Sequence, residues 1–279
     1  MEVFFNLIFL VFLLTFLVPL IQRRMLTNRR IRLISNYEKK RGCRLITLIH
    51  RQEALSLLGF PLARYIDIED SEQVLRAIRL TAGEVPIEII MHTPGGLVLA
   101  SEQIASALKR HKAKVTAMIP HYAMSGGTLI ALAADEIIMD EDAVLGPVDP
   151  LVGDAWRSWP AASVLAALKT DNPNRDDQTL VLGDIAGKAA KQAKEIVFKY
   201  VQDKMANDRA TELATALTSG RWTHDFAITP ETAKKFGLNI GTELPKEVYA
   251  LMDLYPQAAQ RRPSVEYLPT PHFPGRPKP

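Results

Sequence analysis

The sequence predicts an α/β fold with a parallel sheet, built from repeated β-β-α and β-α units. Short apolar runs rich in β-branched residues alternate with stretches whose apolar residues recur at helical spacing. Glycine-containing turns separate two of these runs from the helices that follow them. This alternation is typical of parallel strands joined by helical crossovers, and such folds bind ligands at the carboxyl ends of their strands.

The first strand–helix pair surrounds a Pro-Gly-Gly turn. Residues 85–91 (VPIEIIM) predict a strand, and residues 92–96 (HTPGG) predict the turn. The helix over residues 97–110 follows from apolar positions 97, 100, 104, 105 and 108.

The second pair has a serine at its turn. Residues 115–119 (VTAMI) predict a strand and residues 120–124 a turn, after which Ser125 opens a helix of small residues over 126–134. A third strand is predicted over residues 136–140. Both glycine turns therefore fall at carboxyl ends of successive strands.

The chemistry of Ser125 gives this spacing a function. A serine at the amino end of a helix lies among unpaired N–H groups and a positive partial charge, which stabilise an oxyanion. Glycine lets the backbone approach a substrate closely, so Gly96 and Gly126 are the predicted oxyanion donors. Either motif alone is more simply a turn or a capped helix start. Both motifs together favour a catalytic site.

Five segments carry a resemblance to a known family. They are residues 93–96 (TPGG), 123–127 (AMSGG), 145–150 (LGPVDP), 217–224 (LTSGRWTH) and 228–237 (ITPETAKKFG). Over roughly residues 40–245 the chain resembles the ClpP/crotonase superfamily, and within it the signal-peptide-peptidase-A-like serine peptidases. The closest resemblance is to the prokaryotic serine dehydrogenase proteinases. It implies a ClpP/crotonase-like fold, a serine peptidase and a homo-oligomer.

The serine needs a base, because an unassisted hydroxyl is a weak nucleophile. In the ClpP branch a histidine follows the serine by about 25 residues, but residues 146–150 contain none. His92 and His121 adjoin the two turns and are interpreted as turn or rim residues. His224 is a weaker candidate.

The signal-peptide-peptidase-A-like branch uses a lysine on a later helix, predicted here from about residue 184 to 207. Such a lysine needs its pKa lowered by several units from about 10. The resemblance favours Lys188, with Lys191 as the second choice. Helical spacing instead places both opposite the apolar stripe, on a solvated face.

Residues 151–180 are an insertion relative to shorter relatives. They contain Trp156, Trp159 and a predicted short helix over residues 161–169. A lid or groove wall over the site and an oligomer contact are equally consistent with this composition.

The amino terminus predicts a membrane location. Residues 1–22 are interpreted as a transmembrane helix, since residues 3–21 carry no charge. Residues 23–40 form a basic juxtamembrane segment whose arginines predict a single-pass protein with a cytoplasmic catalytic domain. The lipid bilayer is thus a predicted partner. Cleavage as a signal peptide is disfavoured by the acidic start at Glu2.

Composition supports a single domain over residues 41–250, followed by a proline-rich, disordered tail over residues 251–279. The net charge of +3 gives no footprint for nucleic-acid binding. Scattered histidines and one cysteine, Cys43, predict no metal site, and neither glycine motif is a phosphate loop. No cofactor is expected.

The predicted function is a membrane-anchored serine endopeptidase that uses a Ser/Lys dyad and cleaves peptides or membrane-protein segments. It is expected to be ATP-independent, because the chain contains no ATPase motif. Two alternatives remain, a crotonase-type acyl-thioester-binding protein and an inactive membrane scaffold. Ser125 itself argues against both.

Overall fold

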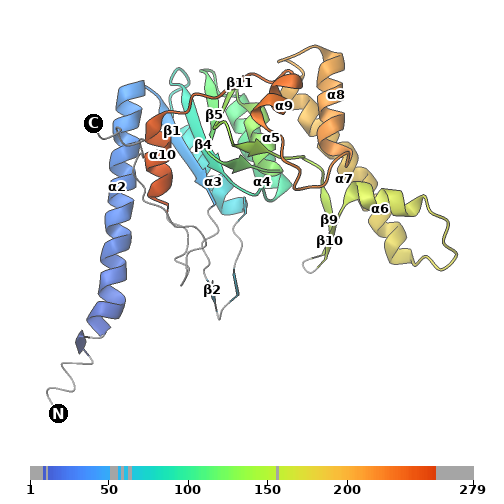
Figure 1. Ribbon diagram of the computed structural model, residues 1–279, viewed down its shortest axis with the longest axis horizontal. Helices are drawn as coiled ribbons and strands as arrows, with labels where there is room; N and C mark the ends of the chain where they lie inside the picture. Colours follow the sequence, from blue (N-terminus) through green and yellow to red (C-terminus); the bar gives the residue numbers. More distant parts are fainter. Residues whose placement is uncertain are drawn as a thin grey trace, which may run out of the picture.

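The computed structural model describes residues 9–10, 12–50, 56–57, 60–61, 65–154 and 157–255. Its centre is a five-stranded parallel sheet with the order β1-β4-β5-β7-β11 (Figure 1). The strands are β1 (Arg44–Ile49), β4 (Ile87–His92), β5 (Val115–Ile119), β7 (Glu136–Met139) and β11 (Ile240–Gly241). This topology confirms the predicted α/β fold with a parallel sheet.

The predicted strands and helices around the glycine turns lie close to their observed positions. β5 coincides with the predicted strand, and α4 (Val98–Lys109) and α5 (Gly126–Ala133) begin and end within one residue of the predicted helices. β4 begins two residues later than predicted. Pro86 has no N–H to donate to a ladder, which explains why the strand begins after it.

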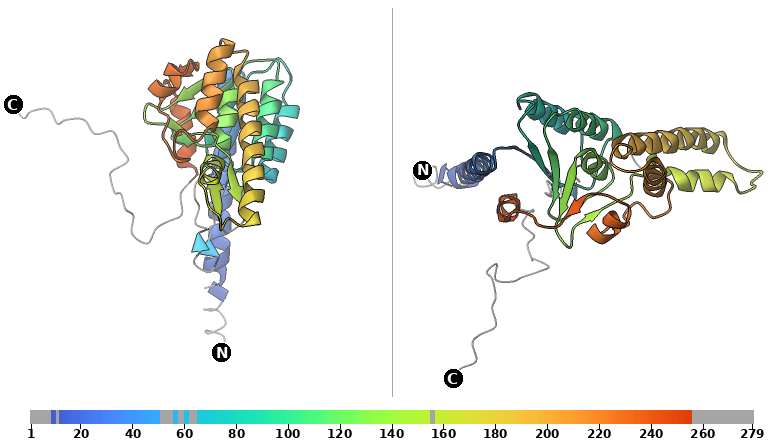
Figure 2. Two further views of the ribbon diagram at one scale, coloured as in Figure 1. Left: turned by 90° about the vertical axis from the view of Figure 1, so that its right-hand side faces the viewer. Right: turned by 90° about the horizontal axis from the view of Figure 1, so that it is seen from above.

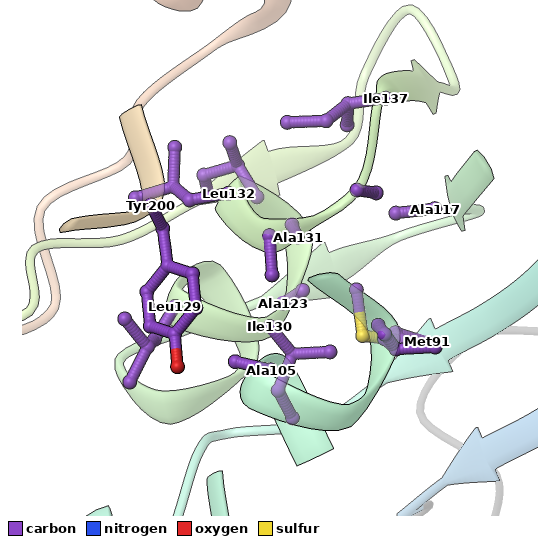
Figure 3. Packing of buried hydrophobic residues seen from close by; sticks show 14 of the residues in the cluster. Met91, Ala105, Ala117, Ala123, Leu129, Ile130, Ala131, Leu132, Ile137 and Tyr200 are labelled. Atoms are coloured by element: carbon purple, nitrogen blue, oxygen red, sulfur yellow. The ribbon is translucent and has the colours of Figure 1, made fainter. Parts of the chain in front are cut away.

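One face of the sheet is covered by a layer of helices with α5 at its centre. These helices are α3 (Ile68–Arg79), α4, α5, α7 (Asp177–Val201) and α8 (Asn207–Thr218). All eight residues of α5 are buried, and small residues such as Ala131 let neighbouring elements pack closely around it (Figure 3). The helix that follows Ser125 is therefore held on all sides.

The opposite face is covered by α2 (Val18–Arg41) and α10 (Lys246–Asp253). Figure 2 shows both helices on the side of the sheet away from α3 and α4. Tyr37 on α2 is 2% exposed and packs with Ile90 and Met118 of the sheet. The predicted juxtamembrane segment 23–40 is thus part of a helix whose end packs against the domain.

The insertion forms an arm that leaves the sheet (Figure 1). It contains the hairpin β9 (Leu151–Gly153) and β10 (Ser158–Pro160), then α6 (Ala161–Leu168), which packs against the start of α7. α6 confirms the predicted short helix; Trp156 lies outside the described residues. α7 begins seven residues earlier than predicted, because the Asp176 side chain caps it by accepting from the Thr179 N–H at 2.7 Å.

The remaining elements are short. They are η1 (Leu13–Leu17), β2 (Ser56–Leu57), β3 (Phe60–Pro61), β6 (Tyr122–Ala123), β8 (Val144–Leu145) and α9 (Pro230–Lys235). β6 pairs with β8 in parallel, so the predicted turn over residues 120–124 includes a short strand.

The predicted transmembrane helix falls partly outside the described residues, which omit 1–8 and 11. Within the described part of the chain, no helix combines the length and apolar character needed to span a bilayer. The structure therefore does not support that helix. Most of the predicted tail, residues 256–279, also lies outside the described residues.

Candidate active site

The two predicted glycine turns lie side by side. Thr93 forms a parallel bridge with Ala123. The Met124 N–H donates to the Thr93 carbonyl at 3.0 Å, and the Thr93 N–H donates to the Tyr122 carbonyl at 3.1 Å. A β-carbon at Gly95 would lie 2.7 Å from the β-carbon of Ser125. The sheet thus brings the Pro-Gly-Gly turn directly against the serine.

Ser125 has an unusual backbone conformation. Its φ of 49° and ψ of −114° make it the one non-glycine residue with positive φ in the described ranges. Such a conformation costs about 1–3 kcal/mol and occurs where the surrounding structure enforces it, often at functional sites. A sharp strand-to-helix turn of this kind projects a nucleophile above a sheet. Here the serine opens the fully buried α5.

Some of the backbone N–H groups around Ser125 donate hydrogen bonds and others do not. The N–H groups of Gly95, Leu97 and Gly127 donate to Thr93 Oγ1, the Ile66 carbonyl and the Met124 carbonyl, respectively. The N–H groups of Gly96 and Gly126 have no acceptor within the described residues. A β-carbon on Gly126 would lie 3.5 Å from the Gly96 nitrogen, so the two turns place these amides close together. Two adjacent free donors can stabilise an oxyanion.

A chain of side chains holds the Pro-Gly-Gly turn from below. Asp70 Oδ2 lies 3.0 Å from His50 Nε2, and His50 Nδ1 lies 2.9 Å from Thr93 Oγ1. With Nε2–H facing the carboxylate, Nδ1 accepts from the Thr93 hydroxyl, whose oxygen in turn accepts from the Gly95 N–H at 3.2 Å. His50 is 5% exposed and Thr93 is fully buried.

The carboxylate at the end of this chain is charged. Burial alone would raise the pKa of Asp70, but hydrogen bonds from His50 and the Asp67 backbone outweigh it and lower the pKa. A charged Asp70 keeps the His50 Nε2–H in place, and the chain thereby fixes the turn.

Thr93→Val is expected to loosen this turn, because valine keeps the shape but removes the oxygen that accepts from Gly95. An unsatisfied buried donor costs about 1–3 kcal/mol, so thermal unfolding should show this loss of stability. We also expect kcat to fall about tenfold. Complete removal of one oxyanion donor lowers kcat by about 10²–10³, and a displaced donor should cost less than that. Thr211→Val, at an exposed position on α8, is the control. A Thr93→Val protein with unchanged kcat would show that the turn needs no such support.

Ser125 opens onto a pocket of about 350 Å³. Its walls include both glycine turns, Leu129 of α5 and Ile196 of α7. Four apolar side chains that line it are also exposed at its rim, namely Tyr65, Leu97, Val98 and Leu151. An open pocket of this kind accommodates an extended chain with apolar side chains.

The two predicted lysine bases lie outside this pocket. Lys188 is 69% exposed and pairs with Asp184 at 2.5 Å, and Lys191 is 79% exposed and lies 3.9 Å from Glu195. The residues of α7 that line the pocket are Ala193 and Ile196. The apolar stripe predicted for α7 is confirmed, with Val197 and Tyr200 fully buried. A lysine base stays a prediction.

Lys204 meets the burial requirement, but at the wrong place. Burial lowers its pKa to about 8, assisted by the charge of Lys109. Its ammonium donates to the carbonyls of Leu132 and Ala134 at the carboxyl end of α5, opposite Ser125. It therefore caps the helix that carries the serine.

A histidine and a carboxylate do line the pocket. His224 Nδ1 lies 2.8 Å from Asp149 Oδ1, and Asp149 is 2% exposed. Asp149 follows β8, within the segment where the sequence offers no histidine. His92 and His121 instead stack with each other, with ring centroids 5.4 Å apart, and do not line the pocket.

The pairing of Asp149 with His224 was missed because the two residues come from segments that are distant in the sequence. The antiparallel bridge between Leu145 and Ile228 draws them together, with N–H to carbonyl distances of 3.0 and 2.9 Å. The available signal was an aspartate in the 145–150 motif together with a histidine in the 217–224 motif. Within the described residues, no three His, Cys, Asp or Glu side chains are grouped as metal ligands.

Comparison with known proteins gives a family. A family model described as ClpP-like SDH-type serine proteinase matches residues 1–277. Two proteins of Methanocaldococcus jannaschii are similar over most of their length. MJ1495 is 52% identical over 98% of this chain and 91% of its own, and MJ0137 is 50% identical over 94% of this chain and 91% of its own.

Solved structures are similar at lower identity. The 1510-N membrane-bound stomatin-specific protease, in a mutant bound to a substrate peptide, is 21% identical with a TM-score of 0.47, covering 67% of this chain and 74% of that one. ClpP1 from Listeria monocytogenes is 15% identical with a TM-score of 0.45, covering 73% and 94%.

Proposed function

Because the chain belongs to the ClpP-like SDH-type serine proteinases, we propose that it is an ATP-independent endopeptidase in which Ser125 is the nucleophile. The observation that carries this assignment is the strained conformation of Ser125 at the start of α5, facing the Gly95–Gly96 turn. Ser125 Oγ attacks the peptide carbonyl carbon, and the amides of Gly96 and Gly126 bind the resulting oxyanion. An acyl-enzyme forms as the amine leaves, and water then hydrolyses it.

The substrate of this site is an unstructured peptide segment. The pocket is open to solvent along an apolar rim that includes Tyr65, Leu97 and Leu151, which suits an extended chain better than a folded surface. If the protein is attached to a membrane, segments of membrane proteins are the peptides that its site would meet.

A Ser/Lys dyad with Lys188 or Lys191 is the mechanism that the family resemblance implies. In the present conformation either lysine would have to leave its ion pair and cross to the pocket side of α7. Burial there would also have to lower its pKa before it could accept a proton near neutral pH.

The test of function combines a label with a substrate. The full chain is treated with a fluorophosphonate, which reacts with activated serines, and the labelled residue is identified by mass spectrometry while casein cleavage is followed. We expect the label on Ser125 and a parallel loss of cleavage. Cleavage that persists after complete labelling of Ser125, or no cleavage by unlabelled protein, would overturn the proposal.

We also propose that the amino-terminal segment attaches the protein to a membrane, with its catalytic domain cytoplasmic. Exposed apolar side chains at Phe9, Leu10, Phe12, Leu20 and Ile21 support this, since clustered exposed apolar residues mark interaction surfaces. The arginines that follow suit the cytoplasmic side.

Fractionation of cells is expected to recover the protein with membranes after an alkaline carbonate wash. A variant that lacks the residues preceding Thr27 should be recovered in the supernatant. Labelling of a cysteine placed in the tail by an impermeant thiol reagent in intact cells would overturn the cytoplasmic orientation, and release of the full chain by carbonate would overturn the attachment. A homo-oligomer stays a prediction, which light scattering of the detergent-solubilised protein will check.

A further inference from the structure

We infer that Lys204 is a site of acylation, at which its amine takes an acyl group from a small activated donor, either an acyl phosphate or an acyl thioester. The site is separate from the serine pocket, and the inference does not depend on the proposed function. It starts from a second cavity of about 260 Å³, which Lys204 lines.

This cavity lies at the amino ends of β7 and β11, whereas the two glycine turns lie at the carboxyl ends of their strands. Its apolar walls include Leu132 and Ile137, both labelled in Figure 3, together with Leu238. The volume is below that of a site for a drug-sized ligand, but it is ample for an acyl group of a few heavy atoms. Lys204 is the only lysine among the described residues that line it.

The two carbonyls that hold Lys204 leave its nitrogen free to react. Nζ donates to the carbonyls of Leu132 and Ala134. A neutral amine has two N–H groups and one lone pair, so both hydrogen bonds persist after the ammonium loses its third proton. The lone pair is then the one part of the nitrogen that neither carbonyl occupies. The amine can therefore attack an acyl carbon in the cavity without leaving α5.

The surroundings of Lys204 favour the neutral amine. Burial lowers the pKa of Lys204 to about 8, and the nearby charge of Lys109 adds to this effect. The carboxylates of Asp135 and Asp203 act in the opposite direction and are outweighed. An exposed lysine ordinarily titrates near a pKa of about 10.4, so fewer than about 1% of such amines are neutral at pH 8. About half of the Lys204 amines are neutral at that pH.

The acylation step conserves atoms and charge. The Nζ lone pair bonds to the acyl carbon, and the bond from that carbon to the phosphate oxygen breaks. The phosphate leaves with the electron pair of that bond and takes the proton that Nζ loses. With a thioester the bond to sulfur breaks instead, and the thiolate takes the proton. The product is an uncharged amide at Lys204, so acylation changes the charge at the carboxyl end of the helix that begins after Ser125.

The experiment measures acetylation at each lysine of the full chain by mass spectrometry. The protein is treated with acetyl phosphate in one arm and with acetyl coenzyme A in the other, from pH 6.5 to 10. The arm in which Lys204 reacts identifies the class of donor. Lys199 on α7 is the internal control, because its side chain is 53% exposed and lies outside the cavity. Circular dichroism confirms that the protein is folded at each pH.

We expect Lys204 to be acetylated about tenfold faster than Lys199 at pH 8, because far more of its amine is neutral. Its rate should level off above about pH 8, whereas rates at exposed lysines ordinarily keep rising to pH 10. Lys109→Gln should move this plateau to higher pH, because a like charge is removed. Asp135→Asn should move it to lower pH, and asparagine can keep the hydrogen bond that Asp135 accepts from the Val115 N–H at 2.8 Å.

Two results would overturn the inference. One is acetylation of Lys204 in neither arm, or no faster than that of Lys199. The other is a rate at Lys204 that climbs to pH 10 without a plateau. Both are read from the unsubstituted chain, so the test decides even if a variant fails to fold. Because the measurement is of mass, a protein that cleaves no peptide would remove the proposed function and leave this inference standing.

Discussion

Ser125→Ala is expected to abolish peptide cleavage and to leave the fold intact. The substitution removes one oxygen, which is the nucleophile, while the Gly96 and Gly126 amides stay in place. Loss of a catalytic serine lowers kcat on the order of 10⁶-fold, with a residual rate from the oxyanion site and substrate binding. The measurement is kcat on an unstructured fluorogenic peptide, at enzyme concentrations high enough to detect the residual activity.

The stability of this variant separates chemistry from structure. Alanine must adopt the same positive φ as the serine, so the backbone strain remains and Tm should change by less than about 2 °C. Ser163→Ala, at an exposed position on α6, is the matched control and should keep full activity. A Ser125→Ala protein that cleaves as fast as this control would place the nucleophile elsewhere.

Much of the fold follows from local patterns in the sequence. Both ends of β5 could be predicted to the residue, because five apolar or β-branched residues stand between two turns. A strand that is buried on both faces reads as such a continuous run. The two glycine turns were equally local, because Pro-Gly-Gly and Ser-Gly-Gly are short turn-forming sequences. Gly95 has a φ of 104°, whereas Gly126 lies in α5, where an added β-carbon would come within 2.2 Å of Ser101 Oγ. Both turns then meet because parallel neighbours end at the same edge of the sheet.

The histidine that lines the pocket could not be placed in the same way. His224 lies on a loop with no periodic pattern, and its position depends on a bridge to β8 that no local propensity encodes. The family resemblance instead predicts a lysine base on α7, where helical spacing places Lys188 opposite the buried stripe. The two arguments conflicted, and the observed exposure of Lys188 follows the helical spacing.

The start of α7 shows another limit of sequence reasoning. The apolar stripe begins near Ala186, so periodicity alone starts the helix there. The Asp176 cap and the contact between α6 and α7 extend it by two turns into the polar insertion. Tertiary packing of the arm therefore stabilises a helical segment whose own pattern is weak.

Gly95→Ala is expected to damage both stability and activity, because this glycine is where the two turns touch. Its φ is 104°, and an added β-carbon would lie 2.7 Å from the Ser125 β-carbon and 2.9 Å from the Met124 carbonyl oxygen. Both neighbours belong to the nucleophile turn, and Ser125 is already held in a strained conformation. Either turn must therefore move to accept the methyl group.

The cost combines two effects of similar size. A non-glycine residue at such a φ costs about 1–3 kcal/mol, and overpacking a close contact costs about 1–3 kcal/mol more. For a domain of this size a loss of that order corresponds to a fall in Tm of about 5–15 °C. A displacement of about 1 Å at a reacting group costs about 10²-fold in rate, so kcat should fall at least that far.

Gly187→Ala provides the matched control, since it adds the same methyl group on α7. Its β-carbon would come no closer than 4.0 Å to Leu165, and alanine stabilises a helix interior by about 0.5–1 kcal/mol relative to glycine. We therefore expect the two variants to shift Tm in opposite directions in the same calorimeter. If Gly95→Ala instead kept its Tm while losing activity, the turns would be able to separate without unfolding, and the serine would owe its conformation to α5 rather than to the Pro-Gly-Gly turn.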